Sequence, residues 1–202
     1  MIEEISFDEM VQNKNEIISL LRSTERAGIE ELIKFLEESG FFTDPASISG
    51  YGNKKYHGSF KGGLSLHSLS VYRELKKYKD AGLYTDIDDS SIIICALLHD
   101  LCKVGTYCIE NKNVKDEKGQ WTSVEIYSSN PDVSFVYGHG EKSVIMIEEF
   151  IKLSNLERMA IRFHMGAYEG ESAWNYVEQA FRLNPFIFFI HVADDYSAKF
   201  VA

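Results

Sequence analysis

Residues 92–103 read Ile-Ile-Ile-Cys-Ala-Leu-Leu-His-Asp-Leu-Cys-Lys, an apolar run that ends in a histidine, an aspartate and a lysine. The run is apolar almost all round, as expected for a helix buried at the centre of a fold. A histidine and a carboxylate at the end of such a helix are costly to bury unless another group compensates them, and a divalent metal ion does so. This stretch therefore predicts a central helix that ends at a metal site.

Length and charge narrow the class of protein. The chain has 202 residues, of which 45% are hydrophobic, and a formal net charge of -10. This length predicts a single domain spanning residues 1–202. The negative charge argues against an extended nucleic-acid surface, which needs clustered lysine and arginine, whereas a small anion held by metal ions remains allowed.

Cysteine spacing and hydropathy predict the compartment. The three cysteines are Cys95, Cys102 and Cys108. An odd number lying close together argues against a disulfide framework and favours a cytoplasmic protein. The apolar segment 185–193 is too short to span a bilayer, so no membrane association is expected.

Hydrophobic periodicity predicts an all-α bundle with one small β-hairpin. A helical lead-in occupies residues 1–40, and further helices are predicted at 64–78, 92–101, 141–153, 155–163, 172–181 and 186–200. Residues 106–114 and 121–127 are rich in β-branched and aromatic side chains and flank a polar turn that contains glycine. They predict a hairpin inserted into the helical body around 106–127.

Histidines and carboxylates interrupt apolar or small-residue surroundings at several helix ends and loops. They are His67, His99-Asp100, His139, His164, and the pair His191 and Asp194. Six histidines are an ordinary number for this length, so the informative feature is their placement where helix ends and loops can converge. Mixed imidazole and carboxylate ligation suits manganese, iron, nickel, cobalt or zinc, with magnesium also allowed. The pattern predicts a site for one or two divalent ions.

The order of these residues resembles the signature of the HD-domain superfamily of metal-dependent phosphohydrolases. His67 precedes the His99-Asp100 pair on a second helix, and Asp194 follows on a last helix. Residues 62–67 (GGLSLH) and 96–103 (ALLHDLCK) are similar to the GGLLEH and ALLHDIGK segments of bacterial 3′-to-5′ exoribonucleases in that superfamily. The resemblance implies an HD-type bundle with its core at 62–200.

The resemblance also implies roles for individual residues. His67, His99, Asp100 and Asp194 would hold one metal, and Asp100 would bridge to a second one held by His139 and His164. Asp100 and Lys103 would be the catalytic residues, with Lys103 contacting a phosphate of the substrate. The implied reaction is cleavage of a phosphomonoester or phosphodiester, most plausibly of a nucleotide, by metal-activated water.

Other positions keep two interpretations. Arg162, Tyr168 and His191 are candidate substrate contacts by their nearness in sequence to His164 or Asp194, and His191 equally suits a core histidine. Asp195 competes with Asp194 as a ligand, and Lys103 equally suits a helix C-terminus, whose dipole favours a cation. His57, in a loop, is interpreted as solvated.

Two departures from the resembling segments keep the function open. Cys102 stands where those segments have glycine, and the chain lacks the nucleic-acid-binding OB domain that precedes the exoribonuclease core and the GYP signature of cyclic-di-GMP phosphodiesterases. The alternatives are a 3′-to-5′ exonuclease on short single-stranded nucleic acid and a non-catalytic sensor module that binds a metal or nucleotide. A di-iron oxygenase with the same ligand set is a third alternative.

Overall fold

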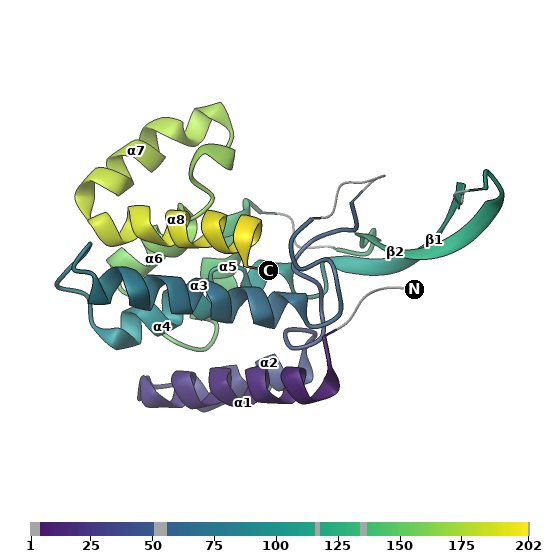
Figure 1. Ribbon diagram of the computed structural model, residues 1–202. Helices are drawn as coiled ribbons and strands as arrows, with labels where there is room; N and C mark the ends of the chain where they lie inside the picture. Colours follow the sequence, from purple (N-terminus) through teal and green to yellow (C-terminus); the bar gives the residue numbers. More distant parts are fainter. Residues whose placement is uncertain (1–4, 51–55, 116–117, 134–136, 202) are drawn as a thin grey trace.

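The computed structural model describes residues 5–50, 56–115, 118–133 and 137–201. Within these ranges the fold has eight α-helices and one two-stranded antiparallel hairpin (Figure 1). The elements are α1 (Phe7–Ser23), α2 (Ile29–Glu38), α3 (Gly63–Asp80), α4 (Asp89–Leu98), β1 (Tyr107–Lys115), β2 (Trp121–Ser129), α5 (His139–Glu148), α6 (Asn155–Arg162), α7 (Trp174–Leu183) and α8 (Pro185–Phe200). Short 3-10 turns lie at Leu101–Lys103, Gly166–Tyr168 and Glu171–Ala173. The predicted mostly helical fold with one hairpin is confirmed.

Helix α4 is the buried helix predicted from residues 92–103. Its N-terminus is capped by Asp88, whose carboxylate accepts a hydrogen bond from the main-chain N–H of Ser91 at 2.6 Å. Every residue from Ser91 to Leu98 is buried, and α4 packs against α1, α3 and α6. The α-helix ends at Leu98, so His99 and Asp100 lie just beyond its last turn, where the chain tightens into a 3-10 turn. Both side chains are thereby placed at the edge of the core.

Helices α1 and α2 form a layer on one side of α3 and α4 (Figure 1). Ile17 and Leu21 of α1 and Leu32 and Leu36 of α2 are fully buried, and they belong to the same hydrophobic cluster as α4. Of the lead-in predicted at 1–40, residues 1–4 lie outside the described part of the chain; the rest is mostly helical, and its apolar face is packed into the core.

Helices α3 and α8 lie side by side (Figure 1). Helix α8 begins with Pro185 in its first turn, and the side chain of Asn184 accepts a hydrogen bond from the main-chain N–H of Phe186. Phe186 and Ile190 are then fully buried in the core. This packing carries the C-terminal part of α8 to the N-terminal part of α3, where the predicted ligands lie.

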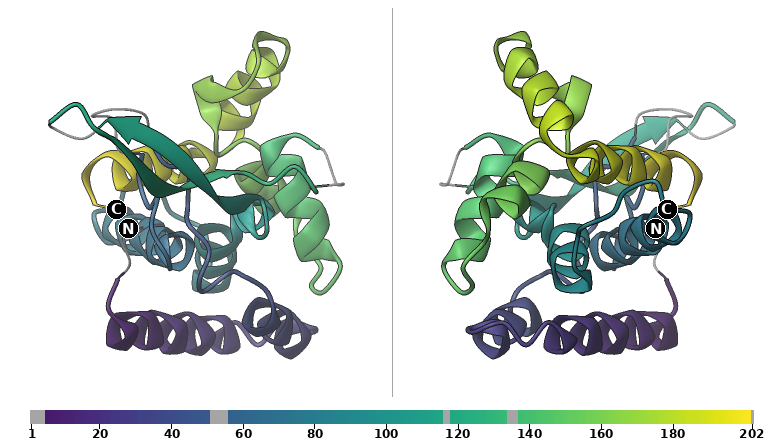
Figure 2. Two further views of the ribbon diagram at one scale, coloured as in Figure 1. Left: turned by 90° about the vertical axis from the view of Figure 1, so that its right-hand side faces the viewer. Right: turned by 90° about the vertical axis from the view of Figure 1, so that its left-hand side faces the viewer.

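The hairpin β1–β2 projects away from the helical body, as does α7 in another direction (Figure 2). Its strands pair from Tyr107 opposite Ser129 to Lys115 opposite Trp121, slightly longer than predicted, and the middle of the turn, 116–117, lies outside the described residues. At the base of β2, the main-chain oxygen of Tyr127 accepts a hydrogen bond from the N–H of Ser49. The loop before α3 is thus tied to the base of the hairpin.

Helix boundaries near the later histidines differ from the predicted ones. Helix α5 begins at His139 instead of residue 141 and ends at Glu148 instead of residue 153. It ends early because Ile151 and Leu153 turn into the core and because Ser154 starts α6 with a capping box. The helix predicted at 172–181 is a 3-10 turn followed by α7. Among the described residues, no helix is both long and apolar enough to cross a membrane.

Candidate metal centre

Helices α3, α4, α5, α6 and α8 bring side chains to one cluster of histidines and aspartates. His67 comes from the second turn of α3, His99 and Asp100 follow α4, and His164 lies just after α6. Asp194 comes from α8, and all of these side chains except Asp194 are almost completely inaccessible to solvent. His139, the first residue of α5, lies at the margin of the cluster with 30% of its side chain exposed. The structure therefore brings together all six residues predicted to hold metal.

Main-chain carbonyls orient two of the imidazoles. The Nδ1 atom of His99 lies 2.9 Å from the oxygen of Ala96, and Nδ1 of His164 lies 2.7 Å from the oxygen of Ile161. Carbonyls near the end of a helix have no partner within the helix, so a histidine three residues later can donate Nδ1–H to one of them. This hydrogen bond leaves Nε2 as the ring's free lone pair, which is the arrangement typical of a metal ligand.

One oxygen of Asp100 faces the first group of ligands. Asp100 Oδ2 lies 3.6 Å from Nε2 of His67 and 3.4 Å from Nε2 of His99. Asp194 Oδ1 completes this group, at 3.0 Å from His67 Nε2 and 3.8 Å from His99 Nε2. The first set of candidate donors thus comprises two imidazoles and two carboxylates.

The other oxygen of Asp100 faces a second group. Asp100 Oδ1 lies 2.5 Å from Nε2 of His139 and 3.5 Å from Nε2 of His164. The sulfur of Cys102 lies 3.5 Å from Nδ1 of His139, on the opposite side of that ring. Asp100 thus stands between two overlapping sets of donors, as a bridging carboxylate would.

The chemistry of these donors fits a divalent transition metal. Nε2 of His67, His99 and His164 is buried and makes no hydrogen bond of good geometry, although carboxylate oxygens of Asp194 or Asp100 lie 3.0, 3.4 and 3.5 Å away. A buried polar atom left without a partner is costly, and a cation that accepts its lone pair removes that cost. Burial lowers the pKa of His67 and of His164, which favours the neutral form that can ligate a metal. The buried His/Asp cluster can therefore hold a metal ion.

Charges within the cluster keep both aspartates ionised. Burial alone would raise the pKa of Asp100, but Lys103 and the neighbouring histidines hold it well below its ordinary value. Burial also opposes ionisation of Asp194, and the contact with His67 outweighs it, so the pKa of Asp194 is lowered. Burial would lower the pKa of His139, yet the Asp100 carboxylate raises it to about 10. Without a metal, the positive charges of Lys103 and of protonated His139 thus offset the negative charges of the two carboxylates.

A cavity of about 730 Å³ opens beside the cluster. Asp100, Asp194, Lys103 and His139 line its inner end. The remaining walls come from Ala46, Ser47, Tyr56, His57, Tyr107, Met165, Tyr168, His191, Asp195, Ala198 and Lys199. A volume of this size is typical of sites for small molecules and cofactors.

No protein-family model, curated protein or solved structure matches this chain. The function has to be argued from the residues themselves.

Lys103 is buried next to the predicted ligands. Its Nζ atom lies 2.7 Å from Asp100 Oδ2, and only 10% of its side chain is exposed. Burial would lower the pKa of Lys103, but the charge of Asp100 raises it above the ordinary value. Lys103 is therefore a fixed positive charge where the cavity meets the cluster.

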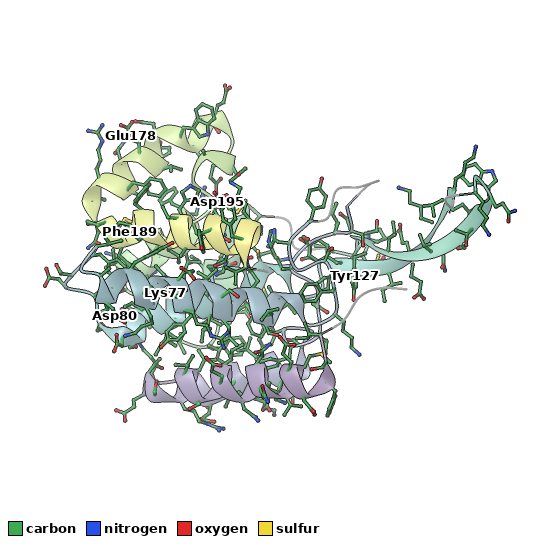
Figure 3. All side chains as sticks on the ribbon, in the orientation of Figure 1. Lys77, Asp80, Tyr127, Glu178, Phe189 and Asp195 are labelled. Carbon is green, nitrogen blue, oxygen red and sulfur yellow. The ribbon has the colours of Figure 1, made fainter. Side chains whose placement is uncertain are left out.

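The two candidate aspartates of α8 lie in different places. Asp194 faces the cluster. Asp195, labelled in Figure 3, instead pairs with Lys199 at 2.6 Å and accepts a hydrogen bond from the hydroxyl of Tyr168, which also lines the cavity. Two adjacent residues point about 100° apart on a helix, so only one of them can face the cluster. That residue is Asp194.

The predicted substrate contacts separate into two groups. Tyr168 and His191 line the cavity, and His191 Nδ1 lies 2.8 Å from the main-chain oxygen of His164. Arg162 does not line this cavity among the described residues, because its guanidinium forms ion pairs with Glu141 and Glu169. These ion pairs connect α5, α6 and the following loop.

Sequence reasoning missed His57. The ring of His57 lies with its centroid 4.9 Å from that of His67, and Nε2 is buried without a hydrogen-bond partner. Burial lowers the pKa of His57 to about 4, and the nearby Lys103 contributes. The interpretation of His57 as a solvated loop residue therefore holds only in part: the residue is half-buried and lines the cavity, while its Nε2 is closed to solvent. His57 is followed by Gly58, whose φ of +58° permits a turn before α3.

Proposed function

We propose that this chain is a metal-dependent phosphohydrolase of the HD type that cleaves a phosphomonoester or phosphodiester of a nucleotide. The observation that carries the proposal is the position of Asp100, whose two oxygens face two groups of imidazoles beside a cavity. The resemblance of residues 62–103 and Asp194 to the HD signature supports the same conclusion. The HD-type core at 62–200, with helices from 1–40 packed on it, is part of this proposal.

The donor set suits one or two ions. His67, His99, Asp100 and Asp194 would hold the first, and His139 and His164 would hold a second that shares Asp100. Divalent ions bound here would supply Lewis acidity toward a phosphoryl oxygen and would lower the pKa of water. Manganese, iron, nickel, cobalt and zinc match these ligands best.

Protein groups in the cavity would hold and orient the substrate. Lys103 offers a positive charge to a phosphate at the place where the cavity meets the cluster. Tyr168 and His191 offer an aromatic face and an imidazole further along the wall. We leave Arg162 out of the proposed contacts because both of its ion pairs engage it elsewhere.

Cavity size and charge favour a small substrate over a polymer. A nucleotide is of the size that a cavity of about 730 Å³ can enclose. The net charge of -10 disfavours long polyanions, whose binding depends on many lysine and arginine contacts.

Metal analysis followed by a substrate panel tests the proposal. We expect the purified protein to contain a divalent transition metal, and to release phosphate or a nucleoside monophosphate from a panel of nucleotides and cyclic nucleotides. Asp100→Ala should remove both metal and activity, while Asp80→Ala, an exposed change at the far end of α3, should leave both (Figure 3).

Other outcomes would overturn the proposal. Release of mononucleotides from a labelled oligomer alone would make the protein an exonuclease. Nucleotide binding without turnover would make it a sensor module, and bound iron with oxygen consumption would make it an oxygenase.

A further inference from the structure

His67 differs from the other buried imidazoles of the metal centre. His99 and His164 each place Nδ1 within 2.9 Å of a main-chain carbonyl, whereas Nδ1 of His67 is buried and has no hydrogen-bond partner. Ligating histidines almost always donate the second ring N–H to a carboxylate, a carbonyl or water, because this fixes the tautomer that presents the other nitrogen to the metal. His67 therefore lacks a partner that its role requires.

His57 lies next to His67 and also has a ring nitrogen without a hydrogen-bond partner. This nitrogen, Nε2, is buried, although His57 is one of the residues that line the cavity. The two rings lie 4.9 Å apart between centroids with an interplanar angle of 45°. A neutral imidazole carries one donor and one acceptor, so an unpaired Nε2 on His57 can accept what an unpaired Nδ1–H on His67 can donate.

The loop that carries His57 is held firmly over the start of α3. The hydroxyl of Ser47 donates to the main-chain oxygen of His57 at 2.7 Å, and the N–H of Ala46 donates to the oxygen of Gly58 at 2.8 Å. Gly58 has a φ of +58°, and a Cβ on Gly63 would lie only 2.0 Å from the Gly58 oxygen. This contact between two glycines brings the His57 ring close to α3.

We propose that His57 is a positioning residue for the metal centre: its Nε2 accepts the Nδ1–H of His67 and so keeps Nε2 of His67 free to ligate. The inference rests on the metal site of the proposed function but not on its reaction. The ring centroids lie 4.9 Å apart, so a rotation of the His57 ring about χ2, a torsion with a broad energy minimum in histidine, can turn the two nitrogens toward each other. Because Nε2 of His57 is closed to solvent, this atom serves the protein and not the substrate.

Three variants test this role without an activity measurement. We expect His57→Leu to raise the dissociation constant for Zn²⁺ and Mn²⁺ on the order of 10–100-fold in metal-stripped protein, as measured by competition with a fluorescent indicator. His57→Gln, which keeps an acceptor, should recover most of the affinity. Ser59→Ala, in the same loop and outside the described cavity lining, should leave it unchanged.

Imidazole nitrogen shifts give a second measurement. In ¹⁵N-labelled wild type without metal, Nδ1 of His67 should show the shift of a protonated, hydrogen-bonded nitrogen, and His57→Leu should abolish that signature. Unchanged metal affinity and unchanged His67 shifts in His57→Leu would overturn the inference, and a raised KM alone would make His57 a substrate contact. A wild-type protein that binds metal but hydrolyses nothing would refute the proposed reaction, while these two measurements would still decide the role of His57.

Discussion

Metal removal should destabilise the folded protein by a measurable amount. In the structure, Nε2 of His67, His99 and His164 is buried without a hydrogen bond. A buried group without any partner costs about 1–3 kcal/mol, and the carboxylate oxygens that lie 3.0, 3.4 and 3.5 Å away reduce this cost without supplying a hydrogen bond of good geometry. Even one such group is a noticeable part of the total stability of a typical domain, about 5–15 kcal/mol. The folded state should therefore gain strongly from a cation at this point.

The size of the gain follows from binding linkage. A metal present at 100 times its dissociation constant stabilises the folded state by about 2.7 kcal/mol. One kcal/mol corresponds to about 2–4 °C in Tm for a chain of this length, so saturating metal should raise Tm by about 5–11 °C over chelator-treated protein. Differential scanning calorimetry with manganese, zinc and a chelator measures the shift.

Two neighbouring aspartates supply the matched variants. Asp194→Asn removes a carboxylate 3.0 Å from His67 Nε2 and should abolish most of the metal-dependent shift. Asp195→Asn changes the adjacent side chain, which pairs with Lys199 at the cavity rim, and should keep the shift. Equal Tm values with metal and with chelator in the wild type would refute the argument that the unpaired imidazoles form a metal site.

Three further changes test the centre and the core around it. Asp100→Ala should abolish metal binding and hydrolysis, while circular dichroism retains a helical spectrum at low temperature. Because the buried Lys103 loses its counter-ion, the free energy of unfolding should fall by about 3–5 kcal/mol. A fully active variant would contradict the mechanism. Glu157→Gln weakens the buried ion pair with Arg26 and should cost about 3 kcal/mol in urea unfolding at neutral pH. Burial alone would raise the pKa of Glu157, but Arg26 holds it below its ordinary value of 4.5. The difference in unfolding free energy between wild type and variant should therefore be complete above pH 4.5 and vanish as the pH falls through the lowered pKa. A difference that grows in acid would disprove the assignment. Gly140→Ala places a Cβ 2.2 Å from the main-chain oxygen of Arg162, so thermal unfolding should show a loss of at least about 1–3 kcal/mol, and an unchanged Tm would mean that α5 and α6 can separate freely.

The fold was largely predictable because each element carries a local signal. Residues 92–98 are apolar all round, which only a buried helix tolerates, and α4 is buried on every side. The hairpin was predictable from β-branched residues around a polar turn. The end of α5 was not, because it depends on Ile151 and Leu153 turning into a core that other helices form. Burial of this kind is a tertiary effect with no local pattern.

The candidate site was easiest to predict where a residue ends a helix. His99, Asp100 and His164 follow helices whose ends point into the core, so their convergence could be inferred from helix order. His57 and Arg162 show the limit of such reasoning. Both lie close in sequence to predicted ligands, but a pair of glycines places one beside His67, and two glutamates hold the other away from the cavity. Neither distinction can be read from spacing along the chain.

Cys102 illustrates how a departure from a motif can still suit the site. Glycine at this position would be required only if the turn after Asp100 needed a positive φ. Among the described non-glycine residues, a positive φ occurs at Glu25 and Asp86 and not at Cys102. Its N–H donates to the hydroxyl of Ser143 at 3.1 Å, which ties the turn to α5. Its sulfur lies 3.5 Å from Nδ1 of His139, the place that a main-chain carbonyl takes beside His99. His139 is the first residue of α5, so no preceding helical turn offers a carbonyl to orient its ring. The Cys102 side chain contacts the ring at that place instead.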